Sequence, residues 1–217
     1  MRFFVTFIFT LAVAVAYLYP QRQQLLLIDS GVNVTKEIEP FLCKEGHKSF
    51  TDESPLNDET GHGSAMAATM AEKLDPFKHC IVVYKVYNKK KIDTTAFFNA
   101  ILKAENDRFK AVVIAHEDEG YYNDEIAVFK NLSLRSVVFV AAGNGGKNLS
   151  YKCDVYPACL AENVKSENFR VVGGTEDLNR GGPINEVANP DKIFNNSQWH
   201  GTSVSTARAA SQFVNPK

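Results

Sequence analysis

Three short segments of this chain carry an aspartate, a histidine and a serine in settings that suit chemistry. Asp29 follows an apolar run, His62 lies between two glycines, and Ser203 follows a Gly-Thr turn that opens a run of small residues. A serine hydroxyl is a weak nucleophile until a neighbouring base takes its proton, and histidine is the usual base. A carboxylate can then hold the other ring N–H of that histidine and stabilise its charged form. The three residues therefore predict a hydrolytic triad, provided that the fold brings them together.

Each of these residues also has an ordinary structural interpretation. An isolated serine at a helix start is most often an N-cap, because its oxygen accepts a hydrogen bond from an orphan backbone N–H. Asp29 before Ser30 and Gly31 fits a turn at the exit of a strand. Ser203 can fill both roles, since a nucleophile can also open a helix. The conjunction of three segments carries the hypothesis, and no single segment does.

The elements that must position these residues can be predicted from the spacing of apolar side chains. Buried parallel strands are predicted by nearly continuous apolar runs at residues 25–28, 81–86, 111–115 and 137–141. Amphipathic helices are predicted by 3.6-residue spacing at residues 63–74, 94–106 and 124–132. This alternation predicts the α/β class, as a doubly wound three-layer sandwich with a mainly parallel sheet. Asp29 and Asn144 then fall at the carboxyl ends of strands, where such sheets place their sites.

Four segments also occur in the order typical of a known family. Residues 26–31, 61–64 and 199–207 contain the aspartate, histidine and serine, and residues 138–144 are a fourth match. Each segment resembles a signature of the subtilisin-like serine peptidases, or subtilases, and the resemblance covers about residues 25–212. It implies that the aspartate, histidine and serine are the catalytic residues.

The fourth segment ends at Asn144, which the resemblance identifies as the oxyanion residue. Its side-chain amide would donate to the oxygen of a tetrahedral intermediate, and the backbone N–H of Ser203 would be the second donor. Asn144 also suits a left-handed turn before Gly145 and Gly146. A phosphate-binding loop is excluded, because the glycine and lysine spacing of residues 143–147 differs from the P-loop pattern.

The chain departs from the family pattern where substrate backbone is expected to pair. The resemblance implies a segment with serine and glycine after the third strand, but residues 114–120 contain Ala115, His116 and Glu117, followed by further acidic residues. These three residues and Gly143 are the candidate substrate-binding residues. If the acidic run lines the specificity pocket, charge pairing would favour Lys or Arg before the scissile bond. A solvated loop is the alternative.

Two further departures concern the helix after Ser203 and the N-terminal region. Ala207 stands where the family usually has a proline, which lowers the rigidity of the helix start. Between the N-terminal apolar run and Asp29 there is no room for the inhibitory prodomain of many secreted members. Folding is therefore expected to proceed alone or with help in trans.

The N-terminus predicts export. A basic residue precedes an apolar run over residues 3–19, which is short for a membrane span and contains small-residue cleavage patterns ending at Ala14 and Ala16. Residues 1–16 are predicted to be a signal peptide, with a peptidase domain over residues 20–217. A signal anchor retained to about residue 19 is the alternative, because aromatic residues at its end suit a membrane interface.

The cysteines agree with an oxidising compartment. An even number of cysteines in a chain with an export signal predicts disulfides. Four cysteines allow three pairings, of which we favour Cys153 with Cys159 and Cys43 with Cys80. No close Cys and His pairs show the spacing of zinc ligands, so no metal site is predicted.

Length and charge narrow the class further. With 217 residues and a formal net charge of -1, the chain suits one domain with a sizeable core, and nothing in its charge indicates a nucleic-acid partner. No cofactor is predicted. Structural calcium is compatible with scattered acidic residues, but no loop has a recognisable calcium spacing. A membrane is an expected partner only if the N-terminal segment is retained, and the oligomeric state stays open.

The combined prediction is an exported serine endopeptidase that hydrolyses peptide bonds through an Asp-His-Ser triad and an acyl-enzyme intermediate. Its expected partners are peptide or protein substrates. Two alternatives remain: a non-catalytic peptide-binding relative, favoured by the altered substrate segment, and a serine esterase, which the same triad permits.

Overall fold

The structure is a computed structural model that describes residues 21–89, 91–118, 120–175 and 177–216. The predicted signal peptide or anchor lies outside these residues. Among them, no helix combines the length and the apolar character needed to cross a membrane.

A parallel sheet forms the centre of the molecule, with the strand order β2-β3-β1-β6-β7-β8-β9. Every pairing in this sheet is parallel. Its strands are β1 (Gln23–Asp29), β3 (His79–Lys85), β6 (Ala111–Ile114), β7 (Val137–Ala141) and β8 (Phe169–Gly173), with the short strands β2 (Lys48–Ser49) and β9 (Glu186–Val187) at the edges. These parallel pairings confirm the predicted mainly parallel sheet.

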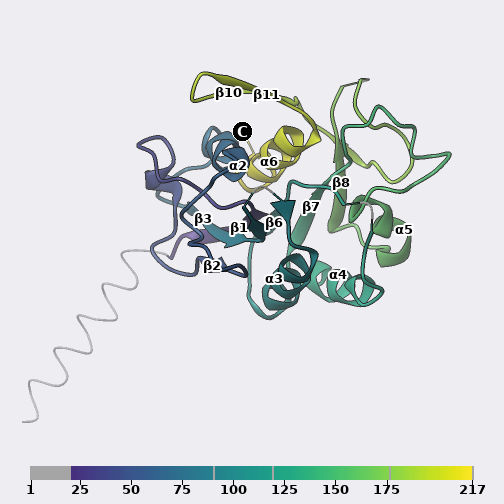
Figure 1. Ribbon diagram of the computed structural model, residues 1–217, viewed down its shortest axis with the longest axis horizontal. Coiled ribbons are helices and arrows are strands. Elements are labelled where there is room, and N and C mark those ends of the chain that lie inside the picture. The colour runs from purple at the N-terminus through teal and green to yellow at the C-terminus, as the bar shows by residue number, and fades with distance from the viewer. Residues whose placement is uncertain (1–20, 90, 119, 176, 217) are drawn as a thin grey trace, which may run out of the picture.

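Helices cover both faces of the sheet, as a doubly wound sandwich requires (Figure 1). One face packs against α2 (His62–Ala71) and α6 (Thr202–Val214), and the other against α3 (Thr94–Asn106), α4 (Glu125–Ser133) and the short α5 (Ala161–Val164). The side chains of β1 alternate between these two cores. Leu25 and Leu27 belong to the α2 and α6 side, and Leu26 and Ile28 to the other side. This double burial explains the uninterrupted apolar runs in the sequence.

The four predicted strands and three predicted helices are all present, with boundaries shifted by a few residues at most. Sequence spacing missed β8 and two antiparallel pairs, β4 (Tyr87–Asn88) with β5 (Lys91–Ile92) and β10 (Asp191–Phe194) with β11 (Ser197–His200). The β10–β11 turn consists of Asn195 and Asn196, both with positive φ. Such a two-residue turn matches the twist of a hairpin, but its strands are too short and polar to give an apolar period.

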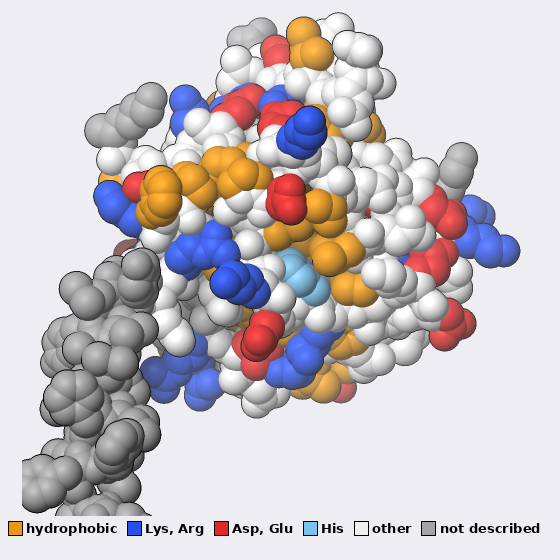
Figure 2. Space-filling model, turned by 90° about the vertical axis from the view of Figure 1, so that its left-hand side faces the viewer, with side chains coloured by type: hydrophobic (Ala, Val, Ile, Leu, Met, Phe, Trp, Pro, Cys, Tyr) orange, Lys and Arg blue, Asp and Glu red, His pale blue; other side chains and the backbone are white. Residues whose placement is uncertain are grey.

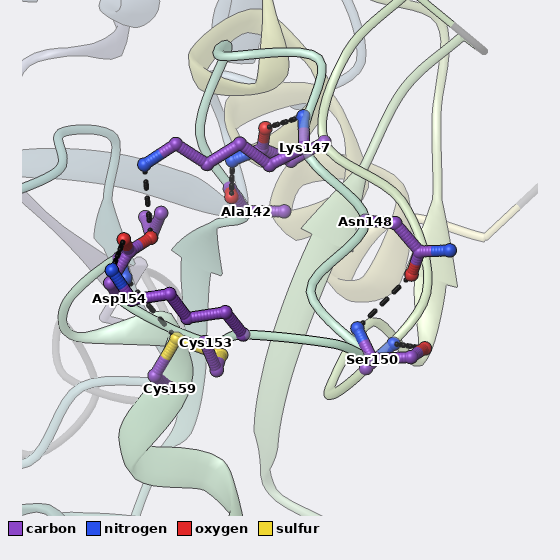
Figure 3. Close-up of a disulfide and its surroundings, with 11 residues drawn as sticks. Ala142, Lys147, Asn148, Ser150, Cys153, Asp154 and Cys159 are labelled. Carbon is purple, nitrogen blue, oxygen red and sulfur yellow. Dashed lines mark hydrogen bonds and ion pairs between the residues drawn. A yellow bond between two sulfur atoms is a disulfide. The ribbon is translucent and has the colours of Figure 1, made fainter.

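Two disulfides are present, between Cys43 and Cys80 and between Cys153 and Cys159. The first ties the loop after β1 to the start of β3. The second closes a short loop between β7 and α5 (Figure 3). Disulfides persist in oxidising compartments, so both agree with an extracytoplasmic protein.

The surface mixes charge types. On the face shown in Figure 2, Lys and Arg side chains are interspersed with Asp and Glu side chains and with hydrophobic ones. This agrees with the nearly neutral net charge of the chain.

Candidate active site

The aspartate and histidine meet at the carboxyl end of the sheet. Asp29 is the last residue of β1, and His62 is the first residue of α2. His62 Nδ1 lies 2.7 Å from Asp29 Oδ1, which also accepts a hydrogen bond of 2.7 Å from the backbone N–H of Ser30. The Asp29 side chain is fully buried. A carboxylate in this position fixes the proton of His62 on Nδ1 and leaves Nε2 as the basic nitrogen.

Two opposing effects set the basicity of His62. Burial disfavours the charged ring and lowers its pKa, but the charge and hydrogen bond of Asp29 outweigh burial, so the pKa of His62 is raised above its ordinary value. The Trp199 ring packs edge-on to His62, with the ring centroids 5.8 Å apart. His62 is therefore held in one orientation, and its ring binds a proton more tightly than a free imidazole does.

A buried carboxylate that sequence reasoning missed holds the start of α2. Asp58 Oδ1 accepts hydrogen bonds from Ser30 Oγ (2.8 Å), from Thr60 and from the backbone N–H of Gly61 (2.9 Å). Its Oδ2 accepts from the backbone N–H (2.9 Å) and hydroxyl (2.7 Å) of Ser64. Burial alone would raise the pKa of Asp58, yet these hydrogen bonds lower it. An aspartate three residues before a glycine at a helix start is a turn signal that could have identified it.

Glycine is required next to His62 because two backbones approach closely there. A Cβ on Gly63 would collide with the carbonyl oxygen of Gly31. The backbone N–H of Gly63 instead donates to Ser30 Oγ at 3.0 Å. The first turn of α2 is thus pressed against the turn that follows Asp29, which fixes the distance between the aspartate and the histidine.

The candidate nucleophile, on α6, lies at the same carboxyl end of the sheet. Ser203 is the second residue of this helix, whose N-cap Gly201 has φ 148°. Ser203 Oγ donates a hydrogen bond of 2.6 Å to the carbonyl oxygen of Ala115. Ala115 follows β6, where Ile114 pairs with Ile28 immediately before Asp29. Among the described residues, no hydrogen bond joins Ser203 to His62. Ser203 therefore lies near the strand that carries Asp29, but its hydroxyl is bonded to a backbone carbonyl and not to the histidine.

Asn144 is oriented by Thr202, a residue that sequence reasoning did not single out. Asn144 Oδ1 accepts hydrogen bonds from the backbone N–H of Thr202 (2.8 Å) and from its hydroxyl (3.2 Å). The hydroxyl in turn accepts from the backbone N–H of Gly143 at 3.0 Å. A backbone N–H can only donate, so the atom facing it must be the amide oxygen. The Asn144 amide nitrogen is therefore left to donate elsewhere.

The Asn179 side chain forms hydrogen bonds that hold the loop that carries Asn144. This buried side chain donates to the carbonyl oxygen of Ala142 at 2.8 Å and accepts from the backbone N–H of Lys147 at 2.8 Å, both drawn in Figure 3. Gly143 has φ 89°, and a Cβ there would collide with the carboxylate of Glu117 and the amide of Asn179. The loop can hold its shape only with glycine at this position.

The candidate substrate-binding residues have different surroundings. Glu117 is exposed and its carboxylate lies against Gly143. The His116 ring is instead buried on the α3 side, edge-on to Phe97 at 4.7 Å and to Tyr87 at 6.3 Å between ring centroids. Neither ring nitrogen of His116 has a hydrogen-bond partner among the described residues. Burial lowers the pKa of His116 to about 4, which keeps it neutral at neutral pH.

A cavity of about 300 Å³ opens beside the Asn144 loop. Three carboxylates line it, from Glu117, Asp118 and Asp154, together with the ammonium of Lys147. Lys147 Nζ lies 2.9 Å from Asp154 Oδ1 (Figure 3). The lining is therefore acidic overall. Within the part of the chain that the structure describes, no group of three or more His, Cys, Asp or Glu side chains is placed to hold a metal ion.

No family model and no curated protein sequence matches this chain. Solved structures do match it. A lanthipeptide protease gives a TM-score of 0.73 at 18% identity, over 89% of this chain and 72% of the other. The epidermin leader peptide processing serine protease of Staphylococcus aureus gives 0.69 at 18% identity, over 89% and 64%.

A cold adapted subtilisin-like serine proteinase gives a TM-score of 0.67 at 17% identity, over 87% of this chain and 72% of the other. This chain thus spans 64% to 72% of the length of these three solved chains. The mainly parallel seven-stranded sheet with helices on both faces agrees with this likeness. The chain has the fold of the subtilisin-like serine proteases, the family whose motifs its sequence resembles.

Proposed function

We propose that this protein is an exported serine endopeptidase in which Asp29, His62 and Ser203 form the triad. The observation that carries the proposal is the 2.7 Å contact between His62 and Asp29 at the carboxyl end of the sheet. Ser203, on α6, lies at the same end. The fold supports the coarser assignment of serine peptidase activity. The two disulfides support the exported location.

The proposed reaction begins when Ser203 Oγ leaves the Ala115 carbonyl and turns toward His62. It then attacks the carbonyl carbon of the peptide while His62 Nε2 takes its proton. Asp29 stabilises the resulting imidazolium. Collapse of the tetrahedral intermediate breaks the C–N bond, and His62 gives its proton to the leaving amine. Water then attacks the acyl carbon while His62 takes its proton, and the C–O bond to Ser203 breaks as His62 returns the proton to Ser203 Oγ.

Charge on the tetrahedral oxygen would be stabilised by two donors. The Asn144 amide nitrogen is available because its oxygen is already held by Thr202. The backbone N–H of Ser203 is at the N-terminal end of α6, where N–H groups lack intrahelical acceptors. In the proposed reaction both donors must face that oxygen before any charge develops, which is the condition for effective stabilisation.

A fluorophosphonate probe tests the proposal without knowledge of the substrate, because it reacts with activated serines. Purified, oxidised protein should be labelled, and Ser203→Ala should abolish the labelling. Ser197→Ala is the matched control, since Ser197 is an exposed serine in β11 and should leave labelling unchanged. Well-folded protein that resists the probe would contradict the proposal.

One observation favours a second candidate, a non-catalytic peptide-binding protein. Ser203 Oγ is bonded to Ala115 and not to His62. A binding protein would retain peptide affinity in Ser203→Ala and would not react with the probe in either form. If the probe labels Ser203, turnover of peptides against simple esters separates a peptidase from an esterase.

A further inference from the structure

A second hollow lies at the opposite end of the sheet from the candidate active site. It has a volume of about 570 Å³ and is lined by residues that precede β1, β6 and β7. The amino ends of these strands therefore form its floor. Asp29 is the last residue of β1, and Asn144 follows the carboxyl end of β7, so the two sites face away from one another.

Four cationic side chains line this hollow: Arg22, Arg108, Lys110 and Arg135. Among the described residues, none of the four lies within ion-pair distance of a carboxylate. The chain as a whole carries a formal charge of -1. Four unneutralised cations around one hollow are therefore a local concentration of charge that composition does not explain.

The contacts of these cations leave their charge available. Arg22 donates to the backbone carbonyls of Pro40, Leu42 and Pro76, which accept hydrogen bonds without neutralising it. Lys110 Nζ lies 5.5 Å from the centre of the Phe213 ring. Arg135 Nη1 donates to the backbone carbonyl of Glu105, and the Glu105 carboxylate accepts a hydrogen bond from Asn131.

Two apolar features adjoin the same hollow. Leu134, at the end of α4, has 80% of its surface exposed and also lines the hollow. Gln21 lines it too, and only one residue separates Gln21 from the apolar run over residues 3–19. Cations beside an exposed leucine, next to the attachment point of an apolar segment, are the combination that suits a membrane interface.

We propose that this basic face docks on a lipid bilayer rich in anionic phospholipid headgroups, in the alternative where residues 3–19 are retained as an anchor in the same membrane and are not cleaved as a signal peptide. The basic side chains would add to the attachment that this segment gives, at about 1 kcal/mol, or about five-fold in partitioning, each near an anionic surface. A free anion would use the cations but neither Leu134 nor the apolar segment. Docking by this face directs the carboxyl ends of the strands, and thus the candidate active site, away from the bilayer.

Vesicle partitioning of the full-length, oxidised protein tests the proposal. The readout is the ratio of its partition coefficients onto equal mixtures of phosphatidylglycerol and phosphatidylcholine and onto phosphatidylcholine alone, at low salt. The apolar segment contributes to both coefficients, so the ratio isolates charge. Each basic side chain near an anionic surface contributes about five-fold. The triple variant Arg108→Gln, Lys110→Gln, Arg135→Gln should therefore lower the ratio by about two orders of magnitude.

The matched control removes three exposed lysines that do not line the hollow, at Lys36, Lys89 and Lys91. It has the same net charge as the triple variant and should lower the ratio far less. Equal ratios for the two variants would overturn the proposal. If the triple variant melts at a lower temperature than the wild type, Arg108→Gln and Arg135→Gln alone should each still lower the ratio about five-fold.

Two further outcomes identify a different occupant. Loss of the lipid preference in inorganic phosphate, at ionic strength matched with sodium chloride, would indicate a discrete anion site and overturn the proposal. Self-association that the triple variant abolishes, in sedimentation without vesicles, would indicate a second copy of the chain instead. Leu134→Gln should lower partitioning onto both vesicle types by similar factors, and no effect on either would contradict membrane docking by this face.

Discussion

Replacing Thr202 by valine should slow the proposed reaction by a small, defined factor. Valine keeps the shape of the side chain and the backbone N–H that donates to Asn144 Oδ1 at 2.8 Å. It removes the hydroxyl that donates to the same oxygen at 3.2 Å. One hydrogen bond of this kind contributes about 0.5–1.5 kcal/mol net. If the whole of it serves to orient the Asn144 amide, Thr202→Val should lower the rate by about two- to ten-fold.

Deleting the Asn144 amide itself sets the upper limit of the rate loss expected from this donor. In subtilisin, a protein of this fold, the loss of one oxyanion donor costs about 10²–10³ in kcat, and that magnitude is carried over here for Asn144→Ala. Because Thr202 would act only through Asn144, the two effects should not multiply. The double variant should react as slowly as Asn144→Ala and no slower.

The assay is the second-order rate of fluorophosphonate labelling, which needs no substrate. Thr202→Ser keeps the hydroxyl and is the matched control. A double variant slower than Asn144→Ala by the full Thr202→Val factor would refute the reasoning, because it would show that Thr202 acts independently. Thr202→Val should also lower the free energy of unfolding by about 1–3 kcal/mol, since the buried Gly143 N–H loses its acceptor.

Three further predictions concern charge. Glu117→Gln should reduce any preference for Lys or Arg before the scissile bond in a peptide library, because Glu117 lines the acidic cavity beside the Asn144 loop. An unchanged cleavage preference would leave Glu117 as a solvated loop residue. Labelling of Ser203 should fall as pH decreases through the raised pKa of His62. Asp29→Asn should move this fall to lower pH, because the charge and hydrogen bond of Asp29 raise that pKa, and an unmoved profile would contradict this role of Asp29. Burial raises the pKa of Glu125 from 4.5 to about 7, so the folded state holds its proton to higher pH and the contribution of Glu125 to stability should fall as pH rises from 4.5 to 7. Glu125→Gln removes this contribution, so its stability relative to the wild type, measured by urea unfolding, should rise over this pH range, and parallel profiles would refute the assignment.

The sequence predicted the parts of the fold that depend on burial on two faces. Strands such as β1 pack against helices on both sides, so their apolar runs are uninterrupted and easily identified. The β10–β11 hairpin packs mainly through Lys192 and Phe194 of β10 and the half-buried Trp199 of β11, and its other side chains are exposed. Four-residue strands of that kind give no signal that differs from a polar loop.

The candidate site was predicted at the level of residue types but not of hydrogen-bond partners. Short motifs identify Asp29 and His62 because flanking glycines are required by close backbone contacts, as at Gly63. Asp58 and Thr202 act through contacts with segments distant in sequence or through a side-chain orientation. No spacing rule connects Thr202 with Asn144, 58 residues away, before the fold is known.

The bond between Ser203 and Ala115 affects how the labelling experiment should be interpreted. Breaking a hydrogen bond of this kind costs about 0.5–1.5 kcal/mol net. Each 1.36 kcal/mol changes a rate about ten-fold, so the observed orientation of Ser203 can slow the reaction by about ten-fold at most. Enzymes lower their barriers by about 8–23 kcal/mol, which is far larger. A complete lack of labelling in folded protein would therefore exceed what this one bond can explain, and would count against the proposed triad itself.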